Sequence, residues 1–298
     1  MMRGRCLCER VRLEIEAPLG PPVHCHCSQC RRASGSAFAT NASASAERVR
    51  FVAGRELISE FESSPGKFRG FCSRCGSPIY NRRPTVPDVL RIRLGLLRDD
   101  PGVRPSAHIW VGSKAPWFDI EDDLPRFEKE PPPGYLVLGR TGSQSRVEGG
   151  GSRAGAMTAR CLCEGARFEI AAELGPVIHC HCSMCRRASG TAFATNASVA
   201  ARGFRFVSGG ELVSEYESSP GESRAFCSRC GSPLYGRNEA FPEIRRVRLG
   251  TLDGDPGNRA VAHAWVGSKA PWFEIRDGLE RFEEEPPARY CAPGRFGV

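Results

Sequence analysis

Short runs in which apolar and polar residues alternate follow one another along the chain, and several are rich in β-branched or aromatic residues. A period of two is typical of strands that bury one face. Glycine and proline at Gly54, Pro65-Gly66 and Pro101-Gly102 indicate turns between the runs. One helical turn is expected over Ser28–Ala33, ending at Gly35, and no longer amphipathic helix is indicated. The sequence therefore predicts an all-β fold. The strands expected in the first part of the chain are Val11–Ile15, Ala37–Ala42, Val49–Val52, Glu56–Phe61, Phe68–Phe71, Val89–Leu94 and His108–Val111.

The pattern occurs twice. Residues Cys6–Phe127 align with Cys161–Phe282 at a constant offset and without a gap, and about two-thirds of the positions are identical. A repeat of this size predicts two tandem domains. We expect a first domain over residues 1–130, a linker rich in Pro, Gly and Ser over 131–156, a second domain over 157–286 and a tail over 287–298. Whether the two copies pack as an internal pseudo-dimer is left open.

Composition narrows the class of protein. No apolar run suggests a signal peptide or a membrane span, so we expect a cytoplasmic protein with reduced thiols and no membrane partner. An odd total of 15 cysteines and their close pairs also argue against a disulfide scaffold. The formal charge of +8 falls to roughly +2 if fourteen thiolates bind four divalent ions, because −14 + 8 is added. With scattered arginines, this makes nucleic acid an unlikely partner.

The cysteines have the spacing of metal ligands. In each copy a C-x-C before a strand and a distant C-x-x-C-G knuckle supply four sulfurs, which predicts a closed, structural zinc site. The expected ligands of the two outer sites are Cys6, Cys8, Cys72 and Cys75 in the first copy and Cys161, Cys163, Cys227 and Cys230 in the second.

Each copy has a second, local group of three cysteines: Cys25, Cys27 and Cys30, repeated as Cys180, Cys182 and Cys185. Three thiolates leave one zinc position open, and a soft fourth ligand such as a substrate thiolate suits that position. A closed site that adds a histidine is the alternative, as is exchange of ligands between the two groups. We expect two zinc ions per domain, about four per chain.

Other candidate residues follow the inner cysteines or lie far from them. Arg31 and Arg32, repeated as Arg186 and Arg187, could bind the carboxylates of an anionic substrate or form a surface pair. His108 and its counterpart His263 are candidate acid–base residues, although a strand histidine is more often structural. Cys291 has no counterpart and is expected to be an idle thiol.

The ordered motifs resemble the glutathione-dependent formaldehyde-activating enzyme / centromere protein V (GFA) family over nearly the whole of each copy. They are C-x-C, H-C-H-C-S-x-C-R-R-A-S-G, F-C-S-R-C-G-S-P, L-G-x-L and H-x-W-V-G-S-K-A-P-W. The resemblance implies a zinc-bound β-tent fold, a structural zinc on the outer cysteines and a catalytic zinc on the inner three. It also implies carbon–sulfur lyase activity on S-hydroxymethylglutathione, with glutathione or another small thiol as substrate.

Two departures from the family pattern stand out. Glu9 and Glu164 follow the first C-x-C, where the family usually has glycine, and the first copy has Leu96 and Arg98 where the second copy keeps Thr251 and Asp253. We therefore expect the second copy to be the more competent site. The alternatives to a lyase are a non-catalytic zinc module that binds a protein or nucleic acid, and a thiol redox or metal sensor.

Overall fold

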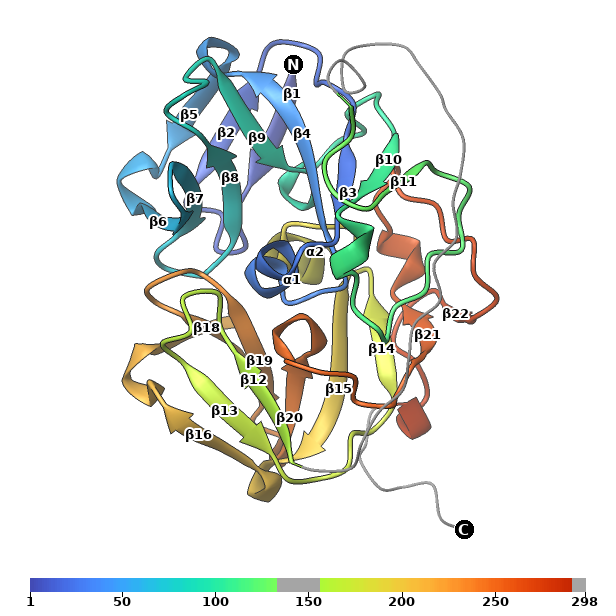
Figure 1. Ribbon diagram of the computed structural model, residues 1–298. Helices are drawn as coiled ribbons and strands as arrows, with labels where there is room; N and C mark the ends of the chain where they lie inside the picture. Colours follow the sequence, from blue (N-terminus) through green and yellow to red (C-terminus); the bar gives the residue numbers. More distant parts are fainter. Residues whose placement is uncertain (133–155, 291–298) are drawn as a thin grey trace.

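The computed structural model describes residues 1–132 and 156–290. Most of the expected linker, the end of the expected tail and Cys291 lie outside the described residues. The described part consists mostly of strands with two short α-helices, arranged as two similar halves (Figure 1). The all-β prediction is therefore confirmed. None of the described helices is long and apolar enough to cross a membrane.

Each half contains a three-stranded antiparallel sheet and an eight-stranded mixed sheet. In the first half the small sheet has the order β1 (Met2–Arg5), β2 (Arg12–Ile15), β5 (Val49–Ala53). The large sheet has the order β11 (Arg126–Phe127), β10 (Ala107–Ile109), β3 (Val23–Cys25), β4 (Ala39–Ser45), β9 (Val89–Arg93), β8 (Pro78–Arg82), β7 (Lys67–Cys72), β6 (Ile58–Ser64).

The second half repeats this topology. Its small sheet contains β12 (Met157–Arg160), β13 (Arg167–Ile170) and β16 (Phe204–Ser208). Its large sheet contains, in order, β17 (Val213–Ser219), β18 (Glu222–Cys227), β19 (Pro233–Asn238), β20 (Phe241–Arg248), β15 (Ala194–Ala200), β14 (Val177–Cys180), β21 (Ala260–Ala264) and β22 (Glu280–Phe282).

The helix α1 (Ser28–Ser34) and its counterpart α2 (Ser183–Ser189) begin and end where local chemistry requires. The Cys27 sulfur accepts a hydrogen bond from the Cys30 amide and so caps the N-terminus of α1. Gly35 ends α1 with a φ of 63°, a left-handed conformation that glycine adopts without a Cβ penalty. The expected helical turn and its glycine stop are therefore present.

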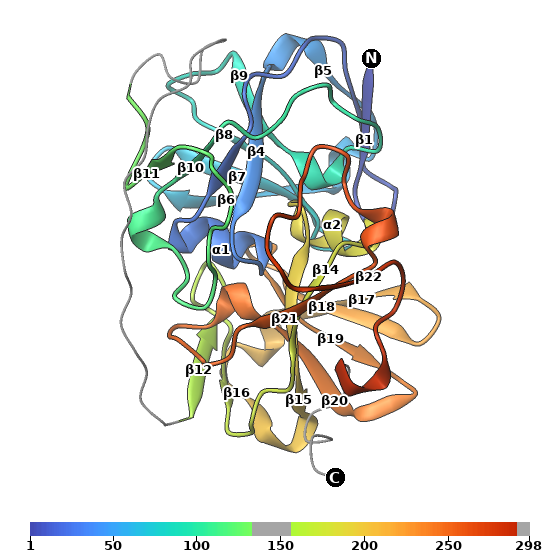
Figure 2. The ribbon, with the colours of Figure 1, turned by 90° about the vertical axis from the view of Figure 1, so that its right-hand side faces the viewer.

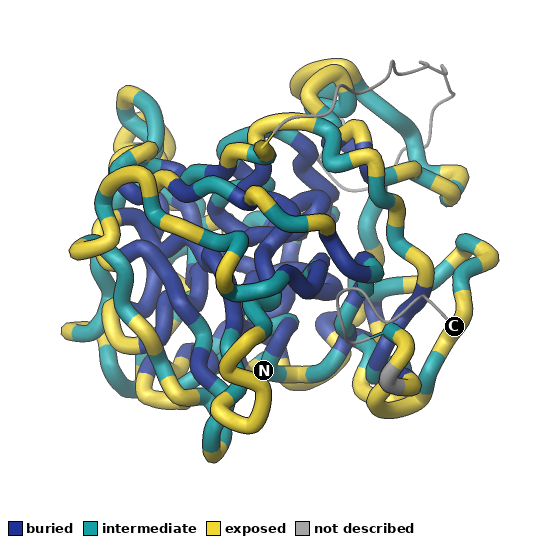
Figure 3. Tube along the Cα trace, turned by 90° about the horizontal axis from the view of Figure 1, so that it is seen from below, coloured by how far each residue is buried: buried dark blue, intermediate teal, exposed yellow. Residues whose placement is uncertain are grey.

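The two halves meet at these helices (Figures 1 and 2), and buried residues of both copies form one continuous hydrophobic cluster. Figure 3 shows the buried residues gathered in the interior and the exposed ones on peripheral loops. Phe38 and Phe193 pack edge to face across the boundary, with ring centroids 5.3 Å apart. The Thr40 and Thr191 hydroxyls form a buried hydrogen bond of 2.9 Å between the copies.

The backbones of the two copies also come close together, with hydrogen bonds of 3.3 Å from Gly250 to Gly35 and 3.4 Å from Gly95 to Gly190. The C-terminal end of α1 packs against a 3₁₀ turn at Leu249–Thr251, and α2 packs against the matching turn at Leu94–Leu96. A Cβ at Gly250 would lie 2.4 Å from the Ser36 amide nitrogen, and one at Gly95 would lie 2.4 Å from the Arg186 carbonyl oxygen. Only glycine fits these two positions without displacing backbone.

Candidate metal centres

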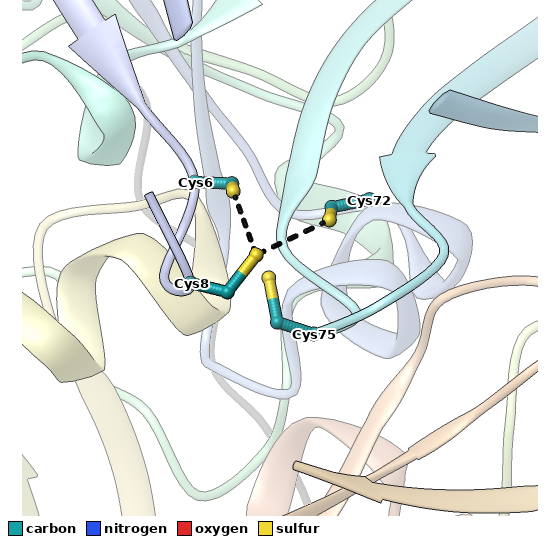
Figure 4. Close-up of side chains that lie close together, drawn as sticks. All are labelled: Cys6, Cys8, Cys72 and Cys75. Carbon is teal, nitrogen blue, oxygen red and sulfur yellow. Dashed lines mark hydrogen bonds between the residues drawn. The ribbon is translucent and has the colours of Figure 1, made fainter. Parts of the chain in front are cut away.

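The four outer cysteines of each copy come together although they are far apart in sequence. Cys6 and Cys8 follow β1, Cys72 ends β7 and Cys75 follows it (Figure 4). All four sulfurs lie within 4.8 Å of one another, with 3.3 Å from Cys6 to Cys8 and 3.7 Å from Cys8 to Cys72. The second copy repeats this arrangement with Cys161, Cys163, Cys227 and Cys230.

The donor set and its spacing fit a zinc ion. Zn–S bonds of about 2.3 Å in a tetrahedron place sulfurs roughly 3.8 Å apart. All described cysteines are free thiols, so the short contacts are not disulfides. Hydrogen bonds among the four thiols lower the pKa values of Cys8 and Cys75 and raise those of Cys6 and Cys72, so two of the four sulfurs favour the thiolate that a metal binds. Gly76 has a φ of 70°, as the expected knuckle requires.

The three inner cysteines also come together. Cys25 ends β3, Cys27 caps α1 and Cys30 lies in its first turn, so a strand-to-helix junction gathers the three sulfurs within 4.8 Å. The Cys25 and Cys27 sulfurs are 3.6 Å apart. Among the described residues, no histidine, aspartate, glutamate or fourth cysteine joins this group or its counterpart, Cys180, Cys182 and Cys185. Each inner group therefore fits an ion with one position left for another ligand.

An arginine, buried in the first copy and partly buried in the second, contacts each inner group, and this contact could not be read from the sequence. Arg69 is 4% exposed and donates from Nη1 and Nη2 to the Cys30 sulfur, at 3.7 and 3.8 Å. Arg224 donates from Nη1 to Cys185 at 3.5 Å. Hydrogen bonds from Cys25 and Cys27 lower the pKa of Cys30 well below its usual value, and the charges of Arg69 and Arg93 add to the shift. Arg69 and its counterpart Arg224 each stand two residues before the phenylalanine of the knuckle motif, and this repeated position is the only signal of the contact in the sequence.

Beside the inner cysteines of the first copy lies a cavity of about 90 Å³. Cys25 and Cys30 line it, and so do the amides of Asn41 and Asn81. The Asn81 side-chain nitrogen donates to the Asn41 side-chain oxygen at 3.2 Å, which orients both amides. A small molecule that enters the cavity would therefore contact Cys25 and Cys30 of the candidate metal centre and two polar side chains.

His108 does not line this cavity. It pairs in register with His24 between β10 and β3, whereas Ile109 pairs with Cys25, so alternation places His108 on the opposite face of the sheet. Its Nε2 lies 2.9 Å from Asp122 Oδ2 and its Nδ1 lies 2.7 Å from His26 Nε2. Because Asp122 accepts, His108 carries its hydrogen on Nε2, and His26 donates to Nδ1. Burial opposes ionisation of Asp122, but the hydrogen bond from His108 lowers its pKa overall.

The second copy builds the same chain from His181, His263 and Asp277, with a hydrogen bond of 2.8 Å from His181 Nε2 to His263 Nδ1. Both histidine chains lie against aromatic residues at the boundary between the copies. The structure thus places the two candidate acid–base residues, His108 and His263, in buried networks away from the cysteine cavity.

Two of the four candidate substrate arginines form ion pairs with the other copy. Arg32 donates to Asp253 of the second copy at 3.0 Å, and Arg187 donates to Glu9 of the first at 2.9 Å. Arg186 donates from Nε to the His181 carbonyl at 3.2 Å. The Nε of Arg31 is buried without a hydrogen-bond partner in the described structure. Binding of a substrate carboxylate by Arg32 or Arg187 would therefore require an interface ion pair to open.

Of the residues that depart from the family pattern, Glu9 takes part in one of these pairs. Glu9 and Glu164 have φ values of 62° and 60°, which explains why glycine suits this position. The equivalence of the copies would place Arg98 beside Arg187, in the way that Asp253 lies beside Arg32. Arg187 instead pairs with Glu9, so Glu9 supplies the carboxylate that Arg98 lacks.

An all-β domain that occurs twice, each time with a four-cysteine group and a three-cysteine group that fit zinc, defines a class of small zinc-thiolate folds. The model of one family in this class, glutathione-dependent formaldehyde-activating enzyme (GFA), matches residues 1–113 and again 156–268. The chain belongs to the GFA family.

Individual proteins are similar to this chain over one copy. A protein of Halomonas elongata named "Putative glutathione-dependent formaldehyde-activating enzyme" is 32% identical over 130 residues, covering 41% of this chain and 82% of that protein. A crystal structure of a Rhodobacter sphaeroides protein is 23% identical and aligns with a TM-score of 0.31 over 42% of this chain and 99% of its own.

Proposed function

We propose that this protein is a zinc-dependent carbon–sulfur lyase that makes or breaks adducts of a small thiol with formaldehyde. The observation that carries the proposal is the three-sulfur group Cys25, Cys27 and Cys30, which has no fourth protein ligand among the described residues and borders a cavity. The name of the Halomonas elongata relative supports the same thiol and aldehyde chemistry. The proposal includes a zinc on each of the four cysteine groups and a cytoplasmic location, where thiols stay reduced.

The reaction that fits this site is the cleavage of an S-hydroxymethyl thiol. The hydroxyl proton leaves, the carbon–oxygen double bond forms, and the carbon–sulfur bond breaks with its electrons on sulfur, so the products are formaldehyde, a thiolate and a proton. A bound zinc would supply a positive charge that lowers the pKa of the substrate thiol.

The residues of the chain would hold and shield the reactants. Arg69 would fix the Cys30 side chain and balance part of the negative charge of three thiolates. The paired amides of Asn41 and Asn81 would hydrogen-bond the hydroxymethyl group in the cavity. The proton would leave to water at the cavity mouth, because His108 lies on the other face of the sheet.

The two copies would act as an internal pseudo-dimer. Their shared cluster of buried apolar residues and the Thr40–Thr191 hydrogen bond support this arrangement. The ion pair of 3.0 Å between Arg32 of the first copy and Asp253 of the second also supports it.

The test is an exchange assay. Zinc-loaded protein is mixed with formaldehyde and glutathione, and interconversion of adduct and free thiol is followed by NMR line exchange. We expect the Cys27→Ser/Cys182→Ser double variant to lose the acceleration. Equal rates for the double variant and the wild type would remove the lyase proposal.

One observation favours a second function, a zinc module that binds an anionic partner. A groove beside the outer cysteines of the first copy is lined by Arg3, Arg5, Arg10, Arg12 and Arg98, together with Glu9 and Glu14. The equivalent positions of the second copy carry Arg160 and Arg167 against three acidic residues. Retention on heparin that is lost in an Arg10→Gly/Arg98→Asp variant, which installs the second copy's residues, would support this function.

A further inference from the structure

The cavity beside Cys25 and Cys30 has a positively charged rim in the first copy. Lys67, Arg82, Arg83 and Arg91 line it, with Glu130 as the acidic residue. Arg82 is paired with Glu60, and Arg83 lies 3.8 Å from Glu130. Within residues 1–132 and 156–290, the side chains of Lys67 and Arg91 have no ion pair or hydrogen bond. Two cations at the edge of a cavity that contains metal-binding sulfurs are therefore free to bind a ligand.

The second copy replaces this arrangement with an internal ion pair. Glu222 stands at the position of Lys67, and Arg246 at that of Arg91. Both carboxylate oxygens of Glu222 accept hydrogen bonds from Arg246 Nη2. Asn238, the counterpart of Arg83, donates to Glu222 Oε2 at 3.1 Å. The Glu222 side chain is 14% exposed, so this carboxylate is held against its neighbours Arg246 and Asn238 rather than extended into solvent.

The charge difference between the two rims is large. Three positions of the rim form the hydrogen-bonded group Glu222, Asn238 and Arg246 in the second copy. At these positions the first copy has Lys67, Arg83 and Arg91, whose formal charges sum to +3. The second has Glu222, Asn238 and Arg246, a sum of zero. Glu222 thus occupies Arg246 as a substrate carboxylate would, and Arg91 in the first copy keeps its guanidinium available. A guanidinium binds a carboxylate through charge-assisted hydrogen bonds, which are stronger than neutral ones.

We propose that the first copy binds thiols that carry a carboxylate, with Lys67 and Arg91 recognising that group, and that Glu222 prevents such binding in the second copy. This inference rests on the proposed function, because it assigns the substrate class of the same site. It also reverses the expectation that the second copy is the more competent one. The Thr251 and Asp253 side chains on which that expectation relied bond to the Arg248 carbonyl and to Arg32, and neither has a contact with the inner cysteines of its own copy.

The experiment measures binding without turnover. Zinc-loaded, full-length protein is titrated with S-methylglutathione in a calorimeter, since this probe has two carboxylates but no thiol to bind the metal. We expect one site per chain in the wild type. Lys67→Glu should weaken that site about tenfold or more, and Glu222→Lys should add a second site. Arg55→Glu, an equal charge change at an exposed position that does not line the cavity, should leave binding unchanged.

The outcomes separate this inference from the lyase proposal. Two equal sites in the wild type, no binding at all, or a Lys67→Glu variant that binds as well as the wild type would each overturn it, whatever the activity. If the exchange assay fails but the binding pattern holds, the lyase proposal fails and the carboxylate site stands. Lys67→Gln and Arg91→Gln, checked for zinc content and circular dichroism, carry the test if Lys67→Glu does not fold.

Discussion

Glu9 and Glu164 both occupy a left-handed backbone conformation, but they form different ion pairs. A residue with a Cβ in this conformation costs roughly 1–2 kcal/mol, whereas glycine adopts it without that cost. Glu9 pairs with the partly buried Arg187 of the other copy, while Glu164 pairs only with the more exposed Arg160 and Arg167. Replacing each of these glutamates with glycine therefore distinguishes the cost of the backbone strain from the stabilisation by the ion pair.

We predict that Glu164→Gly raises stability by about 0.5–1 kcal/mol, because strain is relieved and only weak surface pairs are lost. Glu9→Gly should gain less or become destabilising, since Arg187 would lose its carboxylate partner. Thermal unfolding of the two variants side by side measures the difference. A larger gain from Glu9→Gly than from Glu164→Gly would show that the Glu9–Arg187 pair contributes nothing.

Buried histidines make stability depend on pH. Burial lowers the pKa of His179 to about 3, and it lowers the pKa values of His24, His26 and His181 as well. An unfolded histidine titrates near 6.5, so between about pH 6.5 and pH 3 the unfolded chain binds a proton that the folded chain does not. These buried histidines therefore do not reduce the free energy of unfolding above about pH 6.5, and they reduce it increasingly as the pH falls below that value.

We predict that His179→Asn reduces the slope of unfolding free energy against pH by about 1.4 kcal/mol per pH unit between pH 6 and pH 4. Urea unfolding at several pH values, compared with wild type, gives this slope. The comparison cancels the pH dependence of metal binding, which is common to both proteins. An unchanged slope would mean that His179 is protonated in the folded state.

At the scale of elements, local sequence patterns predicted most of the strands and the helix, but they did not predict where each strand begins and ends. The run His108–Val111 was expected as a strand, yet β10 ends at Ile109 because Trp110 adopts a φ of 60°. The expected strand Glu56–Phe61 begins later, as β6 at Ile58, after a 3₁₀ turn at Arg55–Leu57. Strand β8 was missed, because Pro78–Arg82 has no alternating pattern and is a strand only through its neighbours β7 and β9.

The contact between α1 and the turn at Leu249–Thr251 is tested by a glycine pair. Gly250→Ala should destabilise the protein by about 2–4 kcal/mol, since its Cβ would lie 2.4 Å from the Ser36 amide nitrogen and 2.6 Å from the Arg31 carbonyl oxygen. Gly254→Ala is the matched control, because no atom lies within 4 Å of its Cβ position. Equal melting temperatures for the two variants would contradict the observed approach of the copies.

At the scale of the whole molecule, the outer and inner cysteine groups are expected to contribute differently to the stability of the fold. The outer groups connect the N-terminal hairpin of each copy to the end of β7 or β18, the strand next to one edge of the large sheet, whereas the inner groups lie within one strand–helix junction. Metal binding contributes folding free energy most where ligands are distant in sequence. Loss of an outer ion should therefore open the fold, and loss of an inner ion should leave it closed.

We predict that Cys27→Ser contains about three zinc ions per chain and unfolds close to wild type, while Cys6→Ser is strongly destabilised. Elemental analysis and thermal denaturation of the purified variants provide both readouts. A chelator should likewise remove inner zinc before the circular dichroism spectrum changes. Unfolding that accompanies the first zinc released would show that the inner groups are structural.

The sequence by itself determined the duplication, the all-β class and the helical turn, because these depend on local spacing and on period. It left open whether the two cysteine groups of each copy exchange ligands, and the structure gathers them as separate groups of four and three. Only the tertiary structure decided which charges meet: Arg32 with Asp253, Arg187 with Glu9, Arg69 with Cys30, and Glu222 with Arg246. It also placed the His108 side chain on the face of the sheet opposite to that of Cys25. These pairings join residues distant in sequence, and their energies depend on burial and geometry, which no local pattern encodes.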